Sequence, residues 1–286
     1  MTSTKKDPVL VVLQLAGGND AVNTLIPYTN PHYFDNRPNV RVAEDQVLAI
    51  NDEIGFHPSM APLKGVYDEG HMAIIQGVGY PAPSRSHFRS MDIWHTCEPE
   101  KVGDEGWLGR LIRDIDPKKE NVLTGVNFGR GLPRALAAPG VPVASVGNLE
   151  TYGVLTGIDD EDQRIKALDV FSKVYAPMIG QGPVVDYLAQ TGLDALAGAD
   201  ILSTAPEMYT SSVEYGGDVV GQYMRNIAQT HLANFGTRVL YTTAPYNSFD
   251  THAGQLANHN LLWSETSRAV ADFYDEDQIT GVYYPK

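Results

Sequence analysis

The stretch Gly-Val-Gly-Tyr-Pro-Ala-Pro-Ser-Arg-Ser-His-Phe, residues 77–88, joins a predicted buried strand, His71–Gly77, to a predicted helix, Ser86–His95. A strand end that leads into a helix exposes backbone N–H groups and the positive end of the helix dipole, so it favours anions. Ligands of open α/β sheets bind outside the carboxyl ends of the strands. We therefore expect any chemistry at this turn, on the side chains of Ser84, Arg85, Ser86 and His87. The alternative is a polar turn in which Ser84 or Ser86 only caps the helix.

Strand patterns alternate with helix patterns along the rest of the chain. Short aliphatic and β-branched runs predict strands at Val9–Leu15, Val122–Phe128, Val141–Val146 and Thr237–Thr243. Helical patterns predict helices at Met60–Glu69, Asp104–Ile112, Asp159–Lys173, Val184–Leu196, Asp218–Ala233 and Leu256–Phe273. This order of elements predicts an α/β fold with a largely parallel sheet. We expect a single domain over residues 9–275 with tails at 1–8 and 276–286, and an irregular region at 21–60.

The composition excludes several classes of protein. The chain has 286 residues, 43% of them hydrophobic, and a formal net charge of −14, so it is a poor non-specific partner for nucleic acid or for an anionic membrane. Its single cysteine, Cys97, excludes an internal disulfide framework and a cysteine-rich metal site. The first apolar run is too short to span a bilayer and lacks the features of a signal peptide. The expectation is a cytoplasmic protein that is not embedded in a membrane.

Two further polar clusters follow predicted strands. Gly-Gly-Asn-Asp at residues 17–20 places Asp20 at the end of the first strand, and Asp250 and His252 follow the strand Thr237–Thr243. A carboxylate at a strand end suits a metal ion or a proton transfer, and an Asp and a His two residues apart can converge on one divalent metal. The alternatives are a plain turn, a capping aspartate and a surface histidine. Because parallel strands end at one edge of a sheet, we expect the three clusters to lie near one another.

Several motifs occur in a fixed order along the chain. They are Leu15–Asp20, Gly55–Leu63, Pro83–Phe88 with Asp92 and Trp94, Gly106–Arg110, and Phe249–His252 with Gln255. Together they resemble the bacterial domain of unknown function family numbered 1501, over a stretch from about Val9 to Phe273. That family is grouped with the alkaline phosphatase and sulfatase superfamily. The resemblance implies a central sheet flanked by helices and a two-metal site that hydrolyses phosphate or sulfate esters.

The resemblance also implies roles for individual residues. Asp20, Asp250 and His252 correspond to metal ligands, for zinc, calcium or manganese. Two metals about 4 Å apart could then clamp the attacking and leaving oxygens of a small anionic ester. Apart from the resemblance, the turn before the predicted helix supplies Ser84 or Ser86 as the candidate nucleophile, Arg85 as the candidate anion-binding group and His87 as a further member of the candidate catalytic set.

Three departures from the family pattern favour a second reading. A sulfatase pattern laid on residues 81–85 puts Pro81 where the nucleophile belongs. The metal site of the family would be completed by a Glu-Phe-Gly-Arg-like segment and an Asp-His-Gly-like segment, and neither is present before Lys286. The third departure is that the twin-arginine export signal common in relatives is not present either. We therefore expect a C-terminally short form of the fold, which is either a hydrolase or a non-catalytic binding module. Missing strands would leave an unpaired sheet edge and favour self-association. A serine esterase is disfavoured because the chain has no Gly-x-Ser-x-Gly motif.

Overall fold

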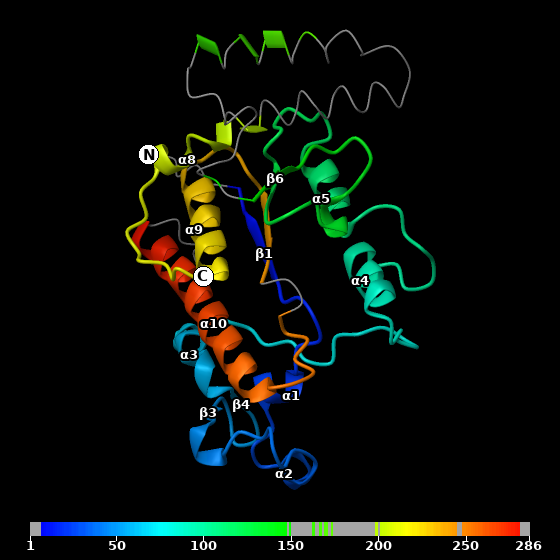
Figure 1. Cartoon of the computed structure of the whole chain (residues 1–286), viewed down its shortest axis with the longest axis vertical. Helices are drawn as coiled ribbons and strands as arrows, with labels where there is room; N and C mark the ends of the chain where they lie inside the picture. Colours follow the sequence, from blue (N-terminus) through cyan, green and yellow to red (C-terminus); the bar gives the residue numbers. More distant parts are fainter. Residues whose placement is uncertain are drawn as a thin grey trace. The chain divides into compact units, whose positions relative to one another are not determined.

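The computed structural model describes residues 7–147, 201–244 and 248–280, together with residues 149, 162, 163, 166, 167, 169, 170, 173, 198 and 199. The chain forms two compact units. Figure 1 labels their helices and strands and colours them along the sequence. Unit 1 comprises Met1–Val12, Tyr80–Thr210 and Gln229–Thr242, and unit 2 comprises Leu13–Gly79, Ser211–Ala228 and Thr243–Lys286. The single domain over residues 9–275 stays a prediction. The predicted helix Val184–Leu196 and most of the predicted helix Asp159–Lys173 lie outside the described residues.

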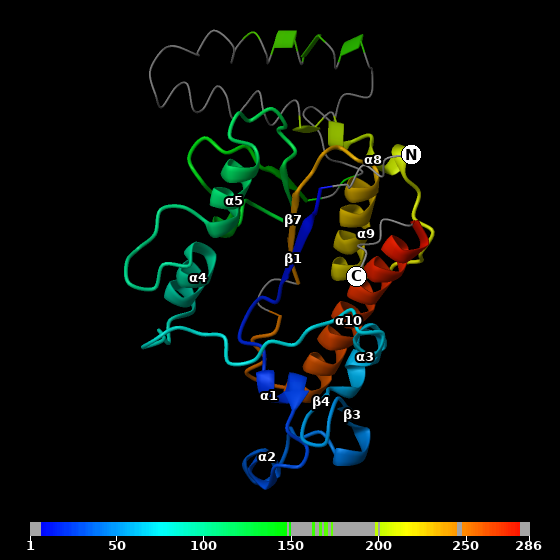
Figure 2. The same ribbon diagram turned by 180° about the vertical axis from the view of Figure 1, so that it is seen from behind.

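A four-stranded parallel sheet confirms the predicted α/β class. Its strands are β1 (Leu10–Gln14), β7 (Val239–Thr243), β5 (Gly125–Phe128) and β6 (Ala144–Val146), in the order β1-β7-β5-β6. The central strand β5 pairs in parallel with both neighbours, so that Val126 lies opposite Leu240 on β7 and opposite Ala144 on β6. Figure 2 shows β7 alongside the edge strand β1. All four strands fall within segments predicted from their aliphatic runs.

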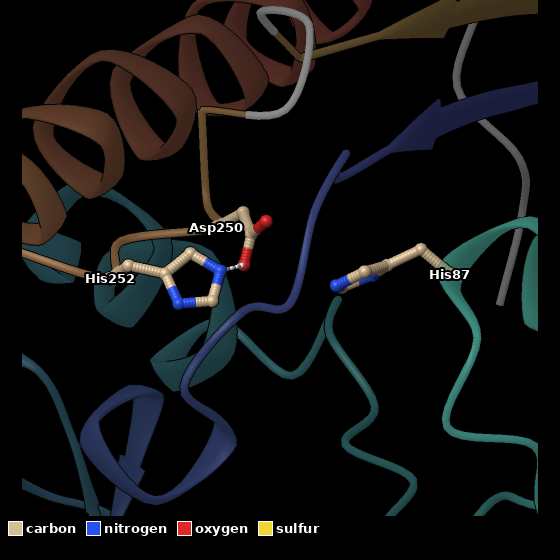
Figure 3. Close-up of side chains that lie close together, drawn as sticks. All are labelled: His87, Asp250 and His252. Atoms are coloured by element: carbon tan, nitrogen blue, oxygen red, sulfur yellow. Dashed lines mark ion pairs between the residues drawn. The ribbon is translucent and has the colours of Figure 1, made fainter.

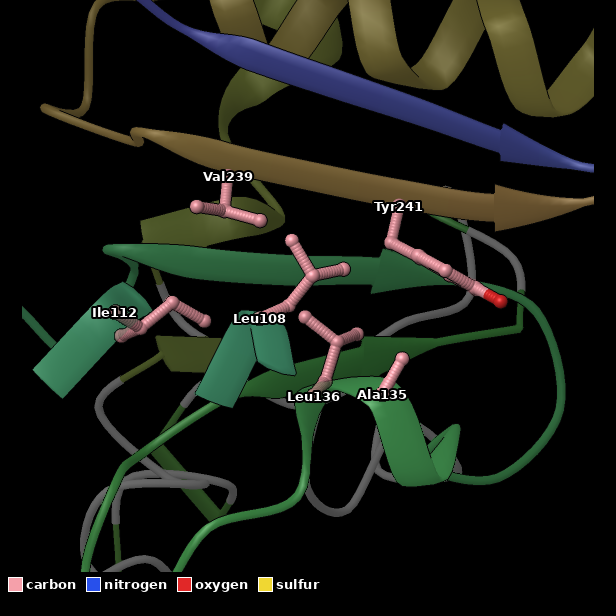
Figure 4. Close-up of a cluster of buried hydrophobic side chains, with 6 residues drawn as sticks. All are labelled: Leu108, Ile112, Ala135, Leu136, Val239 and Tyr241. Carbon is pink, nitrogen blue, oxygen red and sulfur yellow. The ribbon is translucent and has the colours of Figure 1, made fainter. Parts of the chain in front are cut away.

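Helix α5 (Trp107–Ile115) covers this sheet in unit 1. Leu108 and Ile112 lie one turn apart on the helix and pack with Val239 and Tyr241 of β7, as Figure 4 shows. The short helix η3 (Arg134–Leu136) adds Ala135 and Leu136 to the same buried cluster. Burial of these apolar side chains holds the helix on the sheet.

The Gly-Trp-Leu-Gly-Arg motif has a packing role in this unit. A Cβ atom at Gly106 would lie 2.0 Å from the Arg134 carbonyl oxygen, so only glycine allows the start of α5 to approach η3 this closely. Arg110 fixes the same helix by donating hydrogen bonds to the backbone carbonyls of Thr96 and Glu105, at 2.8 and 2.9 Å. Unit 1 also contains α4 (His87–Thr96), which confirms the predicted helix Ser86–His95, and α8 (Ala205–Met208). Helix α9 (Val219–Leu232) belongs to unit 2 as far as Ala228 and to unit 1 from Gln229.

Unit 2 has a small antiparallel sheet that the sequence patterns did not predict. Its strands β2 (Leu25–Ile26), β4 (Gly55–Phe56) and β3 (Leu48–Ala49) are two residues long, in the order β2-β4-β3. Strands this short have no detectable periodicity, which explains why residues 21–60 read as irregular. The helical elements here are α1 (Ala21–Thr24), α2 (Pro31–Asn36), η1 (Glu44–Gln46), η2 (Pro58–Met60) and α3 (Ala61–Asp68).

Helix α10 (Gln255–Thr280) is longer than predicted, because it continues past Phe273 into the predicted tail. The carboxylate of Glu276, which is fully buried, holds this extension in place. It accepts hydrogen bonds from the Ser211 hydroxyl at 2.6 Å, the Ser212 N–H at 3.0 Å and the Tyr215 hydroxyl at 2.6 Å. Burial and the neighbouring Glu276 carboxylate raise the pKa of Tyr215, so its hydroxyl keeps the proton that it donates. A buried carboxylate with three donors explains why the helix does not end earlier.

The predicted strand His71–Gly77 is wrong. The segment forms neither helix nor strand, and Ile75 and Val78 are 80% and 62% exposed. Gly70 and Gly77 at its two ends have positive φ angles of 78° and 71°, which turn the chain away from an extended course. Aliphatic composition gives a strand only where a neighbouring strand supplies pairing and packing, and this segment has no such neighbour among the described residues.

No helix in the described ranges is both long enough and apolar enough to cross a membrane.

Candidate functional site

The chain segments that follow β1 and β7 run side by side in unit 2. The Ala244 N–H donates to the Gln14 carbonyl at 2.8 Å, and the Phe249 N–H donates to the Ala16 carbonyl at 3.1 Å. Gly17 makes this approach possible, because its φ is 94° and a Cβ atom there would lie 2.5 Å from the Asp250 nitrogen. Two of the three predicted clusters, at residues 17–20 and 250–252, are therefore brought together as expected from parallel strands.

The Asp250 carboxylate and the His252 imidazole lie in direct contact beyond the end of β7. His252 Nε2 lies 2.9 Å from Asp250 Oδ1, as the dashed line in Figure 3 shows. The His252 N–H also donates to the Asp250 carbonyl at 3.0 Å, so a tight backbone turn holds the two residues. The side chain of Asp250 is 27% exposed and that of His252 is 81% exposed, which leaves the pair open to solvent. Zinc binds imidazole nitrogen and carboxylate oxygen at about 2.0–2.2 Å, so adjacent ligand atoms lie roughly 3 Å apart, the separation seen here.

Asp20 is in a different environment from Asp250. It caps helix α1, because its Oδ1 accepts the Asn23 N–H at 3.3 Å. Its Oδ2 accepts hydrogen bonds from Arg37 Nη1 and Gln255 Nε2, both at 2.5 Å. Burial alone would raise the pKa of Asp20, but the hydrogen bonds from Arg37 and Gln255 outweigh it, and the pKa is lowered. The carboxylate is charged, and both of its oxygens already act as acceptors.

One face of α10 supports this loop with three side chains that sequence reasoning did not connect. Gln255, His259 and Trp263 follow one another at four-residue spacing and so lie on the same face of the helix. His259 Nε2 lies 3.2 Å from Asn19 Oδ1, and Trp263 Nε1 donates to Thr24 Oγ1 at 3.1 Å. The four-residue spacing of these side chains is the feature of the sequence that could have identified them, because it places three hydrogen-bond donors on one face of the helix.

His259 packs against a second buried histidine, His57. The ring centroids are 5.3 Å apart, and each residue is 2% exposed. The Ser59 N–H donates to His57 Nδ1 at 3.1 Å, which places the ring proton of neutral His57 on Nε2. Burial lowers the pKa of His57 to about 4, and the neighbouring His259 acts in the same direction. Both rings are neutral at pH 7, because burial also lowers the pKa of His259.

The His57 pair predicts an acid-sensitive fold. The unfolded chain takes up a proton at His57 near its ordinary pKa of 6.5, whereas the folded chain resists protonation until about pH 4. Neutral His57 therefore contributes to the free energy of unfolding in full above pH 6.5. This contribution is lost as the pH falls from 6.5 towards 4. The variant His57→Asn keeps an acceptor for the Ser59 N–H. In thermal melts over this pH range, its melting temperature is expected to fall less than that of the natural chain. His32→Asn, at an exposed histidine, is the control and is expected to follow the natural chain. Equal slopes for all three proteins would contradict the role of His57.

The predicted nucleophile stretch lies in unit 1, at the start of α4. The Ser84 hydroxyl accepts the Ser86 N–H at 3.2 Å, and the Ser90 hydroxyl donates to the Ser84 carbonyl at 2.8 Å. Ser84 therefore stabilises the turn before α4, which is the kind of local role that the alternative allows. Arg85 and His87 are exposed, and His87 is the first residue of α4. The catalytic roles of Ser84, Arg85, Ser86 and His87 stay predictions.

No protein-family model, no curated protein and no solved structure matches this chain. The resemblance to domain of unknown function family 1501 thus stays a prediction as well.

Proposed function

We propose that this chain is an alkaline-phosphatase-like protein that binds one divalent cation at Asp250 and His252 and hydrolyses phosphate or sulfate esters. The observation that carries the proposal is the solvent-accessible Asp250–His252 pair beyond a parallel strand, with its donor atoms 2.9 Å apart. The resemblance to family 1501 supplies the reaction class, and the position beyond a strand end agrees with where α/β proteins bind ligands.

The donor set fits zinc or manganese better than calcium. One imidazole nitrogen and one carboxylate oxygen suit these transition metals, whereas calcium prefers an all-oxygen shell. When bound, the cation would supply positive charge that stabilises negative charge on the ester oxygens. Asp250 would offset part of the cation charge, and His252 must be neutral to bind. Cation affinity is therefore expected to fall as the pH is lowered, because a protonated imidazole cannot bind the cation.

A second candidate is a non-catalytic binding module that keeps the fold. The specific observation in its favour is that Asp20 Oδ2 accepts hydrogen bonds from Arg37 and Gln255, so a second metal ion would have to compete with Arg37 for this carboxylate. Two protein ligands hold a cation weakly, and a catalytic site needs more than retention of the cation. Both the hydrolase and the binding module would bind a cation, but only the hydrolase would turn over an ester.

Turnover of chromogenic phosphate and sulfate esters separates the candidates. With zinc or manganese added, the natural chain is expected to hydrolyse one of the two ester classes, and chelator should stop the reaction. Asp250→Asn is expected to lower the rate at least about 100-fold, because it removes a charged ligand, while Asp35→Asn, at an exposed aspartate on α2, should leave the rate unchanged. Cation binding without turnover of either ester would contradict the hydrolase proposal and support the binding module.

A further inference from the structure

Asp20 does not fit the role of a metal ligand, because a cation of the protein itself already occupies its carboxylate. Arg37 Nη1 and Asp20 Oδ2 are 2.5 Å apart, and their side chains are only 24% and 14% exposed. A divalent ion on the same oxygen would bring positive charge against the Arg37 guanidinium in a partly buried setting. The two cations exclude each other on electrostatic grounds.

We propose that Arg37 stands in for a second metal ion at Asp20 and that its guanidinium binds the anionic oxygens of the ester. The inference rests on the proposed function for the identity of the anion, a phosphate or a sulfate. A planar guanidinium offers several N–H donors in a fork that matches two oxygens of such a group. It can therefore supply the positive charge that the other metal ion supplies in a two-metal site.

The donors of Arg37 are only partly used. Its side chain makes one hydrogen bond within the residues that the structure describes, from Nη1 to Asp20. The other guanidinium N–H groups remain for an incoming oxyanion. Asp20 orients the guanidinium of Arg37 through the hydrogen bond from Nη1. Asp20 also accepts a hydrogen bond from Gln255, so Arg37 is not its sole partner.

The surroundings hold Arg37 in position before any ligand arrives. Its guanidinium carbon lies 5.9 Å from the centroid of the Tyr33 ring. Tyr33 is itself fixed, because its hydroxyl donates to Asn23 Oδ1 at 2.8 Å and accepts the Val42 N–H at 2.8 Å. The buried Tyr33 and the charged Asp20 thus hold the guanidinium from two sides, an arrangement that lowers the entropy cost of binding an anion.

Binding of inorganic sulfate and phosphate to the metal-free protein tests Arg37 directly. In chelator, either anion is expected to raise the melting temperature of the natural chain, and Arg37→Met is expected to bind it at least about tenfold more weakly. Arg41→Met is the matched control, since Arg41 lies 5.9 Å over the Phe34 ring in the same segment and is not paired with Asp20. The control should bind the anion like the natural chain. Equal anion binding by Arg37→Met and the natural chain would overturn the proposal.

Cation titration of Asp20→Asn tests the other half of the proposal. If Arg37 is the cation at Asp20, zinc and manganese affinities should stay within about twofold of the natural chain, whereas loss of a true ligand costs at least about tenfold. A tenfold loss of cation affinity in Asp20→Asn would overturn the stand-in role.

Should Arg37→Met fail to fold, the double variant Asp20→Asn with Arg37→Met leaves no unpaired charge and is expected to lose anion binding in the same way. Because the anion test uses metal-free protein, it can fail or succeed independently of cation binding at Asp250 and His252.

Discussion

Gly17→Ala is expected to lower the free energy of unfolding by about 3 kcal/mol or more. Two effects add at this position. The φ of 94° is unfavourable for any residue with a Cβ atom, and that atom would lie 2.5 Å from the Asp250 nitrogen and 2.9 Å from the Asp250 Cβ. The backbone after β1 must therefore move away from the backbone after β7. Equilibrium unfolding in urea measures the loss.

Gly18→Ala is the matched control for this change. Gly18 has no positive φ, and a Cβ atom at this position would have Asp250 Oδ1 as its nearest neighbour at 3.8 Å, an ordinary contact. The free energy of unfolding should change by no more than about 0.5 kcal/mol. Equal effects of the two substitutions would mean that the close approach of the two strand ends does not exist in solution.

The double variant Asp250→Asn with His252→Ala is expected to abolish stabilisation by zinc or manganese. A ligand present at 100 times its dissociation constant stabilises the folded chain by about 2.7 kcal/mol, which corresponds to roughly 5 °C or more in melting temperature. The natural chain should show this shift on addition of the cation. The double variant should melt at one temperature with and without it.

Helix α2 provides the control for that experiment. His32 and Asp35 are also an exposed imidazole and carboxylate close together in the chain, so the pair His32→Ala with Asp35→Asn removes the same chemical groups from another place. This control should keep the full cation-dependent shift. A shift that survives in the Asp250 and His252 variant would show that the cation binds elsewhere.

The parallel sheet could be predicted because its strands are aliphatic runs bounded by turns, as in Val239–Thr243. The same reasoning failed for His71–Gly77, whose composition is equally aliphatic. A strand needs a partner, and the availability of a partner is a tertiary property that local sequence does not carry. The exposed Ile75 in this segment and the exposed Val78 just after it give an apolar surface instead, and self-association of the chain stays a prediction.

The site was predictable to the extent that strand topology determines it. Parallel strands explain why residues 17–20 and 250–252 could be expected together. The environment of Asp20 could not be read in the same way, because Arg37 lies 17 residues along the chain and Gln255 lies 235 residues along it. These distant partners engage Asp20, whereas Asp250 contacts His252 only two residues away, and that difference separates the two carboxylates.

Metal content of the purified chain, measured by elemental analysis and paired with thermal melts in the presence and absence of chelator, tests the cation site most directly. With zinc or manganese present in excess, the Asp250–His252 pair predicts binding of about one ion per chain and a lower melting temperature in chelator, because the bound ion stabilises the folded state. A chain that carries no metal after incubation with either ion, and that melts at the same temperature with and without chelator, would contradict a cation site at Asp250 and His252.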